Sequence, residues 1–140
     1  MTINDRVISK VWIAKLYGKN ASELTQKTID LLMPVKNIIH TITGDNGKEF
    51  ADHHTISKEL AIDFYFARPY HSWERGTNEN TNGLICQYLP KGSSFENITN
   101  QDIMRVQNIL NNRPRKKLNF LTSNEFFYLN LSKQKVAFVT

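Results

Sequence analysis

Residues 72–91 read SWERGTNENTNGLICQYLPK, and they are the most informative stretch of this 140-residue chain. Small and polar residues surround the acid Glu79, which is the third residue of the segment TNEN. Most of these residue types lower helix propensity relative to Ala or Leu, so a purely structural helix would not favour them. Sequences that depart this densely from local preferences often do so at a functional site. The stretch therefore predicts a helix that carries Glu79, ends near Leu89 and forms part of a site.

A second acid lies in a similar setting. Asp45 belongs to the segment TGDNGKEF, residues 43–50, and precedes Glu79 by 34 positions. We expect Asp45 where a strand ends and a helix begins, a common place for ligands in α/β proteins. The alternative is a hairpin turn, which Asn-Gly favours between two strands, although no strand alternation follows Gly47. Glu79 also has an alternative, because most glutamates on helices are simply solvated.

Together the two acids suggest a divalent-metal site that acts on nucleic acid. Ions of the Mg²⁺ type prefer carboxylate oxygens and keep water or phosphate oxygens in their other positions. Two such ions can activate the attacking oxygen and stabilise the leaving oxygen in phosphoryl transfer, a chemistry that uses several carboxylates. His53 and His54 are adjacent and point about 100° apart on a helix, so we expect a solvated face there. The role of His71 stays open.

Composition favours a globular protein with a polyanionic partner. The net charge is +5, hydrophobic residues make up 40% of the chain, and the sequence pI is about 9.4. Such a balance suits nucleic acid, and the run of four cations between residues 113 and 117 is the densest basic segment. The single cysteine excludes an internal disulfide. With no apolar run that could span a membrane and no apolar leader, we expect a cytoplasmic protein without a membrane partner.

Hydrophobic patterning predicts an α/β order of elements, ββαβαβααα. The expected strands cover residues 2–8, 10–17, 36–43 (buried) and 61–67. The expected helices cover residues 21–33, 48–60, the Glu79 segment, a segment that starts at the Thr99–Asp102 cap and ends at 111–114, and residues 122–130, before a terminal strand or tail.

Three segments carry a resemblance to a known family: HSWERGTNENTNGLICQYLPKG, TGDNGKEF and LNNRPRKKLNFLTSNEFF. They closely resemble transposases of the insertion sequence 30 family, within the DDE transposase and retroviral-integrase superfamily. The resemblance implies a ribonuclease H-like α/β fold, Mg²⁺ or Mn²⁺ as cofactor, and cutting and joining of transposon ends. It assigns Asp45 to the second catalytic aspartate and Glu79 to the catalytic glutamate, both as metal ligands.

The same resemblance implies DNA as the partner, both as transposon ends and as target, and a homo-oligomer or a full-length transposase as a further partner. The residues expected to contact nucleic acid lie around Glu79 and in the basic run. They are Arg75, Asn78, Asn82, Lys91, Arg113, Arg115, Lys116 and Lys117.

Two departures from the family pattern shape the functional expectation. The family's first aspartate lies on an opening strand upstream of the first strand here, and neither Asp5 nor Asp30 matches it. We therefore expect a partial catalytic core over residues 1–130 with a tail at 131–140, two separate sheet fragments, and no activity of the chain by itself. The second departure is Cys86, where the family carries a cation. The alternatives are a non-catalytic DNA-binding or transposase-interfering fragment, or a relic without function.

Overall fold

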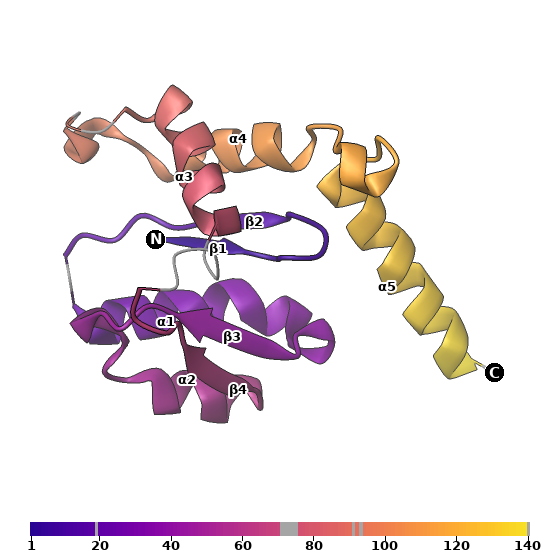
Figure 1. Cartoon of the computed structure of the whole chain (residues 1–140), viewed down its shortest axis with the longest axis horizontal. Coiled ribbons are helices and arrows are strands. Elements are labelled where there is room, and N and C mark those ends of the chain that lie inside the picture. Colours follow the sequence, from indigo (N-terminus) through magenta and orange to yellow (C-terminus); the bar gives the residue numbers. More distant parts are fainter. Residues whose placement is uncertain (19, 71–75, 91, 93, 140) are drawn as a thin grey trace. The chain divides into compact units, whose positions relative to one another are not determined.

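The computed structural model describes residues 1–18, 20–70, 76–90, 92 and 94–139, with side chains described as far as Leu131. The described strands are β1 (Thr2–Asn4), β2 (Val11–Ile13), β3 (Thr41–Gly44) and β4 (Asp63–Phe66). The described α-helices are α1 (Ala21–Leu32), α2 (His53–Leu60), α3 (Gly76–Tyr88), α4 (Asn100–Asn111) and α5 (Ser123–Val139). Short 3-10 helices are η1 (Met33–Ile38), η2 (Lys48–Phe50), η4 (Phe95–Asn97) and η5 (Lys116–Leu118). The predicted order ββαβαβααα is confirmed (Figure 1).

The chain divides into two compact units. The first comprises Met1 and Ala14–Gly76, and the second comprises Thr2–Ile13 and Thr77–Thr140. Each unit contains one two-stranded sheet among its described residues, β3–β4 in the first and β1–β2 in the second. This matches the expectation of two separate sheet fragments.

In the first unit, β3 and β4 pair in parallel, and α1 and α2 pack together beside them (Figure 1). The register places Gly44 opposite Phe66 at the carboxyl end of both strands. Gly44 allows a close approach here, because a Cβ at this position would lie 2.8 Å from Cζ of Phe64. The ladder continues by one bond from the Ala67 N–H to the Gly44 carbonyl at 2.8 Å. Asp45 therefore follows directly on a strand end that close packing fixes.

In the second unit, the β1–β2 hairpin packs against α4. The buried core consists of Val11, Ile13, Ile103, Val106 and Leu110, with partly buried residues of α3 packed against it.

The outer edge of β2 is completed by side chains rather than by a strand. The Asn111 side chain accepts a bond from the Val11 N–H and donates one to the Val11 carbonyl, each at 2.8 Å. Gln107 accepts a third bond, from the Ile13 N–H at 2.8 Å. Two amides of α4 thus satisfy backbone groups that a neighbouring strand would otherwise pair.

The helix caps agree in part with the sequence. Thr99 and Asp102 form a reciprocal capping box, as predicted. Asn20 caps α1 by accepting a bond from the Ser22 N–H, and Glu23 accepts a bond from the Tyr17 N–H just before this helix. The short α2 ends at Ala61, which adopts a left-handed conformation with φ of 54°.

Several predicted boundaries are wrong for local physical reasons. The predicted strands 2–8 and 10–17 are shorter, because the Asp5 carboxylate accepts from the Val7 and Ile8 N–H groups and turns the chain there. The predicted strand 36–43 is a 3-10 helix over Met33–Ile38, with Pro at its start, and only then the strand β3.

Burial and helix length also differ from expectation. Strand β3 is not a buried strand, since Gly44 is its one buried residue. The predicted helix 48–60 is divided into η2 and α2. The helix predicted for 122–130 continues as α5 to Val139, so the described residues after 130 are helical and form no strand. Tyr88, the last residue of α3, is 44% exposed.

We expect Asn111→Ala to lower the free energy of unfolding by about 2–4 kcal/mol, since it leaves the buried N–H and C=O of Val11 unpaired. Urea denaturation of the whole chain measures this. Asn108→Ala, at an exposed position of the same helix, is the matched control and should change stability little. A loss no larger for Asn111→Ala than for the control would contradict the role of Asn111.

The capping carboxylates predict a dependence of stability on pH. Bonds from the Thr99 backbone and hydroxyl lower the pKa of Asp102, and the corresponding bonds from Thr122 lower the pKa of Glu125. A depressed folded-state pKa gives stability that is present above the unfolded-state pKa and is lost as pH falls through the folded-state pKa. Thermal melting should therefore show that Asp102→Asn and Glu125→Gln destabilise the chain near pH 6. The loss should shrink below about pH 3, and a loss that does not depend on pH would contradict this.

Candidate functional site

Asp45 lies at the carboxyl end of β3, between that strand and η2, as the sequence predicts. Its side chain is half-buried and accepts a bond from the Gly47 N–H at 3.3 Å. The neighbouring Asn46 donates to the Ala67 carbonyl at 2.9 Å and ties this turn to the end of β4. Because β3 and β4 are parallel, the hairpin alternative for this turn is excluded. The carboxylate thus occupies an edge of the sheet where ligands commonly bind.

Glu79 lies in the first turn of α3 and is exposed. Thr81 is the buried residue of this helix, and Leu84, Ile85 and Leu89 pack partly buried against the core. At 100° per residue Glu79 points away from that side, on the face of α3 that also carries Cys86. Within its own unit, Glu79 therefore faces away from the core.

The two acids belong to different compact units, so each is described in its own surroundings. Within the described ranges, no group of three or more His, Cys, Asp or Glu side chains is placed to hold a metal ion. No helix in the described part of the chain combines the length and the apolar character that a membrane span needs.

The residues predicted to contact nucleic acid around Glu79 have different surroundings. Asn78 is half-buried, and its side-chain oxygen accepts a bond from the Asn4 amide at 2.7 Å, so it links α3 to β1. Asn82 is exposed on α3. Arg75, Lys91 and the loop residue His71 lie outside the described residues.

The basic run lies in one loop between α4 and α5. Arg113, Lys116 and Lys117 are exposed there, and Lys117 also donates to the Arg6 carbonyl at 3.1 Å. Arg115 is half-buried and donates to the Leu110 carbonyl at 3.2 Å, which ends α4. Burial, and then the charge of Arg113, lower the pKa of Arg115. The structure thus places the four cations in one loop, and two of them, Arg115 and Lys117, also donate to backbone carbonyls.

One exposed residue of this loop was missed from the sequence. Phe120 is 72% exposed and has a φ of 65°, directly after Asn119 with a φ of 53°. The sequence feature that could have indicated this turn is Asn119, because Asn tolerates the left-handed region.

The histidine prediction is correct for one residue and wrong for the other. His54 is exposed, whereas His53 is half-buried and packs against Phe64 and Phe66 at ring-centroid distances of 5.5 and 4.8 Å. The His53 Nδ1 lies 2.9 Å from the Phe50 carbonyl oxygen. Aromatic residues of β4 therefore cover His53 and draw it out of solvent.

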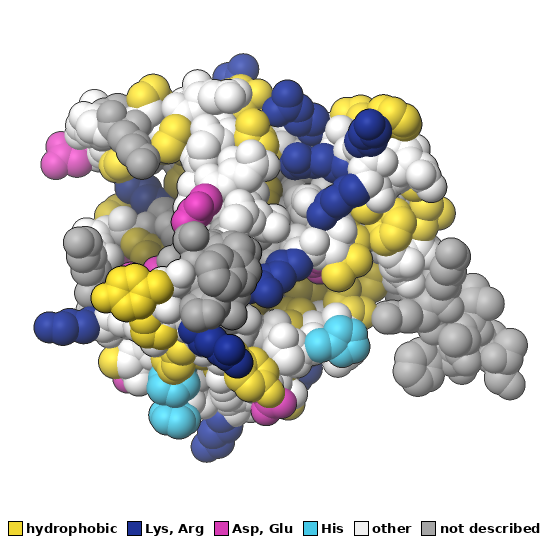
Figure 2. Space-filling view, in the orientation of Figure 1, with side chains coloured by type: hydrophobic (Ala, Val, Ile, Leu, Met, Phe, Trp, Pro, Cys, Tyr) yellow, Lys and Arg dark blue, Asp and Glu magenta, His cyan; other side chains and the backbone are white. Residues whose placement is uncertain are grey.

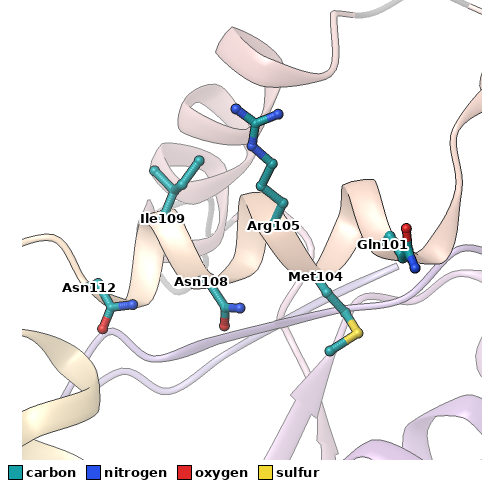
Figure 3. Close-up of a pocket in the computed structure, with 6 residues that line it drawn as sticks. All are labelled: Gln101, Met104, Arg105, Asn108, Ile109 and Asn112. Atoms are coloured by element: carbon teal, nitrogen blue, oxygen red, sulfur yellow. The ribbon is translucent and has the colours of Figure 1, made fainter.

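A depression on the surface of α4 carries none of the predicted chemistry (Figure 3). Figure 3 shows its side chains leaving a single helix in different directions. It is lined by Gln101, Met104, Arg105, Asn108, Ile109 and Asn112. None of these residues is an acid, so this depression is not the predicted metal site.

Comparison with known sequences identifies transposases over the whole chain. The chain is 56% identical over 140 residues to the transposase for insertion sequence element IS4351 of Bacteroides fragilis, covering 100% of this chain and 43% of that protein. It is 38% identical over 125 residues to the transposase InsI for insertion sequence element IS30A of Escherichia coli K12, covering 89% of this chain and 33% of that protein. The chain thus spans less than half the length of these curated relatives, and no family model matches it.

Comparison with solved structures identifies integrases. The catalytic core domain of BIV integrase superposes with a TM-score of 0.68 at 18% identity, covering 96% of this chain and 88% of that one. The simian T-cell lymphotropic virus intasome in complex with the PP2A regulatory subunit B56 gamma gives a TM-score of 0.65 at 19% identity, covering 79% and 41%. At these identities the likeness concerns the fold, which is the ribonuclease H-like α/β fold of an integrase catalytic core. Sequence and fold thus agree, because the residues of this chain align with transposases and its fold is that of an integrase catalytic core.

Proposed function

We propose that this chain forms part of the catalytic core of a transposase that cuts and joins DNA in the cytoplasm by divalent-metal-dependent phosphoryl transfer. The observation that carries the proposal is the alignment of all 140 residues with a transposase at 56% identity. The integrase-like fold adds independent support, because it places Asp45 at a strand end and Glu79 in the first turn of a helix. The substrates are the transposon ends and the target DNA.

Asp45 and Glu79 are the residues that we propose as ligands for Mg²⁺ or Mn²⁺. Both offer hard carboxylate oxygens, which are the donors that such ions prefer. When bound, the ions activate the attacking oxygen and stabilise the leaving oxygen. The protein's own part is to hold Asp45 rigidly, which the Gly47 N–H and the Asn46 contact to Ala67 accomplish. Two carboxylates would fill only some of the coordination positions of such an ion. Water or phosphate oxygens would fill others.

The exposed cations of the α4–α5 loop are proposed as contacts to DNA phosphates. Arg113, Lys116 and Lys117 are exposed on one loop, and Asn82 is exposed on the same helix as Glu79. Arg75 and Lys91 belong to the same proposal on the basis of the family resemblance. Oligomerisation, with further copies or with a longer transposase, is the corresponding proposal for a protein partner.

A second function rests on the basic loop alone. The loop keeps its backbone bonds and its exposed cations without any contribution from Asp45 or Glu79. A chain that binds DNA through it without catalysis would compete with active transposase for transposon ends. DNA binding together with loss of metal affinity would favour this alternative.

Replacing either proposed ligand should weaken metal binding. We expect Asp45→Asn and Glu79→Gln each to weaken Mn²⁺ binding at least about tenfold, because each removes a contact to a charged ligand worth about 1.5–3 kcal/mol. The free Mn²⁺ signal in electron paramagnetic resonance, followed during titration of the whole chain, measures the affinity. Asp63→Asn, at an exposed carboxylate that begins β4, is the matched control. Affinities equal to that of the control would refute both ligands.

DNA binding should depend on salt through the exposed cations. We expect Arg113→Gln and Lys116→Gln each to reduce the slope of log affinity against log salt concentration by about 0.9. Fluorescence anisotropy with a labelled duplex at several salt concentrations measures the slope. Arg115→Gln should instead lower stability, since its guanidinium bonds the Leu110 carbonyl. Unchanged slopes for Arg113→Gln and Lys116→Gln would rule out these phosphate contacts.

A further inference from the structure

The loop between α4 and α5, residues 112–122, is compact and held by its own backbone. The Arg115 carbonyl accepts bonds from Leu118 N–H at 2.9 Å and Phe120 N–H at 3.0 Å, and the Arg115 N–H donates to the Leu121 carbonyl at 3.0 Å. An isolated bridge joins Pro114 to Thr122 at the base. These hydrogen bonds make residues 112–122 a compact, ordered loop rather than an extended linker.

Within this loop, the Phe120 side chain is exposed, whereas the Leu118 side chain is buried. Leu118 is 5% exposed, whereas Phe120 is 72% exposed. The φ of 65° at Phe120 is in the left-handed region, which is a genuine outlier for a bulky residue and costs free energy. Folding therefore holds a large apolar side chain in solvent at an energetic cost, and such strain often accompanies a functional contact.

The surroundings of Phe120 are strongly positive. Residues 112–122 contain four cations and no acid, and three of those cations are exposed. In Figure 2, Lys and Arg side chains lie among hydrophobic ones on the part of the displayed face that Figure 1 shows as the segment between α4 and α5. An exposed aromatic ring among cations is the combination that binds unpaired nucleic acid, because cations contact phosphates while the ring stacks on a base.

We propose that Phe120 stacks on an unpaired base at a DNA end while the neighbouring cations hold the backbone. This inference deepens the proposed function and rests on it, because it requires that the chain bind DNA. The occupant is an unpaired base, since a base pair within the duplex already has both faces covered by its neighbours. An apolar protein surface could cover the Phe120 ring, but it would leave the loop's positive charge without a complementary partner.

The test compares two DNA molecules with the whole chain. One is a short blunt duplex, and the other is the same duplex with a short single-stranded extension at one end, both labelled for anisotropy. The unaltered chain should prefer the extended duplex. Phe120→Ala should lower affinity for the extended duplex about tenfold, a typical loss for one stacked base, and leave affinity for the blunt duplex nearly unchanged.

Three further variants sharpen the comparison. Phe120→Trp keeps an aromatic ring and should keep the preference. Phe120→Gly should remove the preference while raising the thermal midpoint, because glycine adopts a positive φ without strain. Tyr17→Ala, which removes a 79% exposed aromatic ring in the first unit, is the matched control and should leave the preference unchanged.

The outcomes separate this inference from the function on which it rests. If the unaltered chain binds neither DNA, the proposed function and the stacking contact both fail. If it binds both DNAs with a salt-dependent affinity but Phe120→Ala keeps the full preference for the extension, only the stacking contact is overturned. Equal weakening on both DNAs by Phe120→Ala would also overturn it, since the ring would then contact the duplex itself.

Discussion

The second unit depends on the pair of hydrogen bonds between the Asn111 amide and the backbone of Val11. Both residues are almost fully buried, with Val11 1% exposed and Asn111 2% exposed. Without this amide the outer edge of β2 would present unpaired backbone groups inside the core, which is costly there and promotes strand pairing elsewhere. Asn111 also ends α4, so the same contact fixes where the basic loop begins. The Asn111 amide therefore helps to position the basic loop that follows α4.

The sequence predicts the order of elements well and their boundaries less well. The Thr99–Asp102 cap and the apolar positions Ile103, Val106 and Leu110 predicted α4, because capping and periodicity are local properties. The strand predicted over 36–43 failed, because Pro34 starts a 3-10 helix in an apolar run that reads equally well as a strand. The edge contacts of Asn111 and Gln107 join residues about a hundred positions apart, so no local pattern reveals them.

The candidate site was predicted through residue types more than through structure. Asp45 and Glu79 stood out because polar and glycine-rich surroundings are costly in regular elements, and each acid has the expected place in its own unit. The sequence alone did not distinguish the predicted DNA-contact residues that are exposed from those that make internal hydrogen bonds. Asn78 and Arg115 make internal hydrogen bonds, whereas their neighbours Asn82 and Lys116 are exposed, a difference that only tertiary packing decides. Phe120 escaped notice because an apolar residue in a loop is ordinarily expected to be covered.

The proposed function requires that this chain carry a divalent-metal site for DNA chemistry. Anomalous diffraction from crystals of the chain grown with Mn²⁺ tests it most directly. We expect a manganese peak about 2.1 Å from a carboxylate oxygen of Asp45. Manganese bound only at other carboxylates, with Asp45 and Glu79 both free of metal, would contradict it.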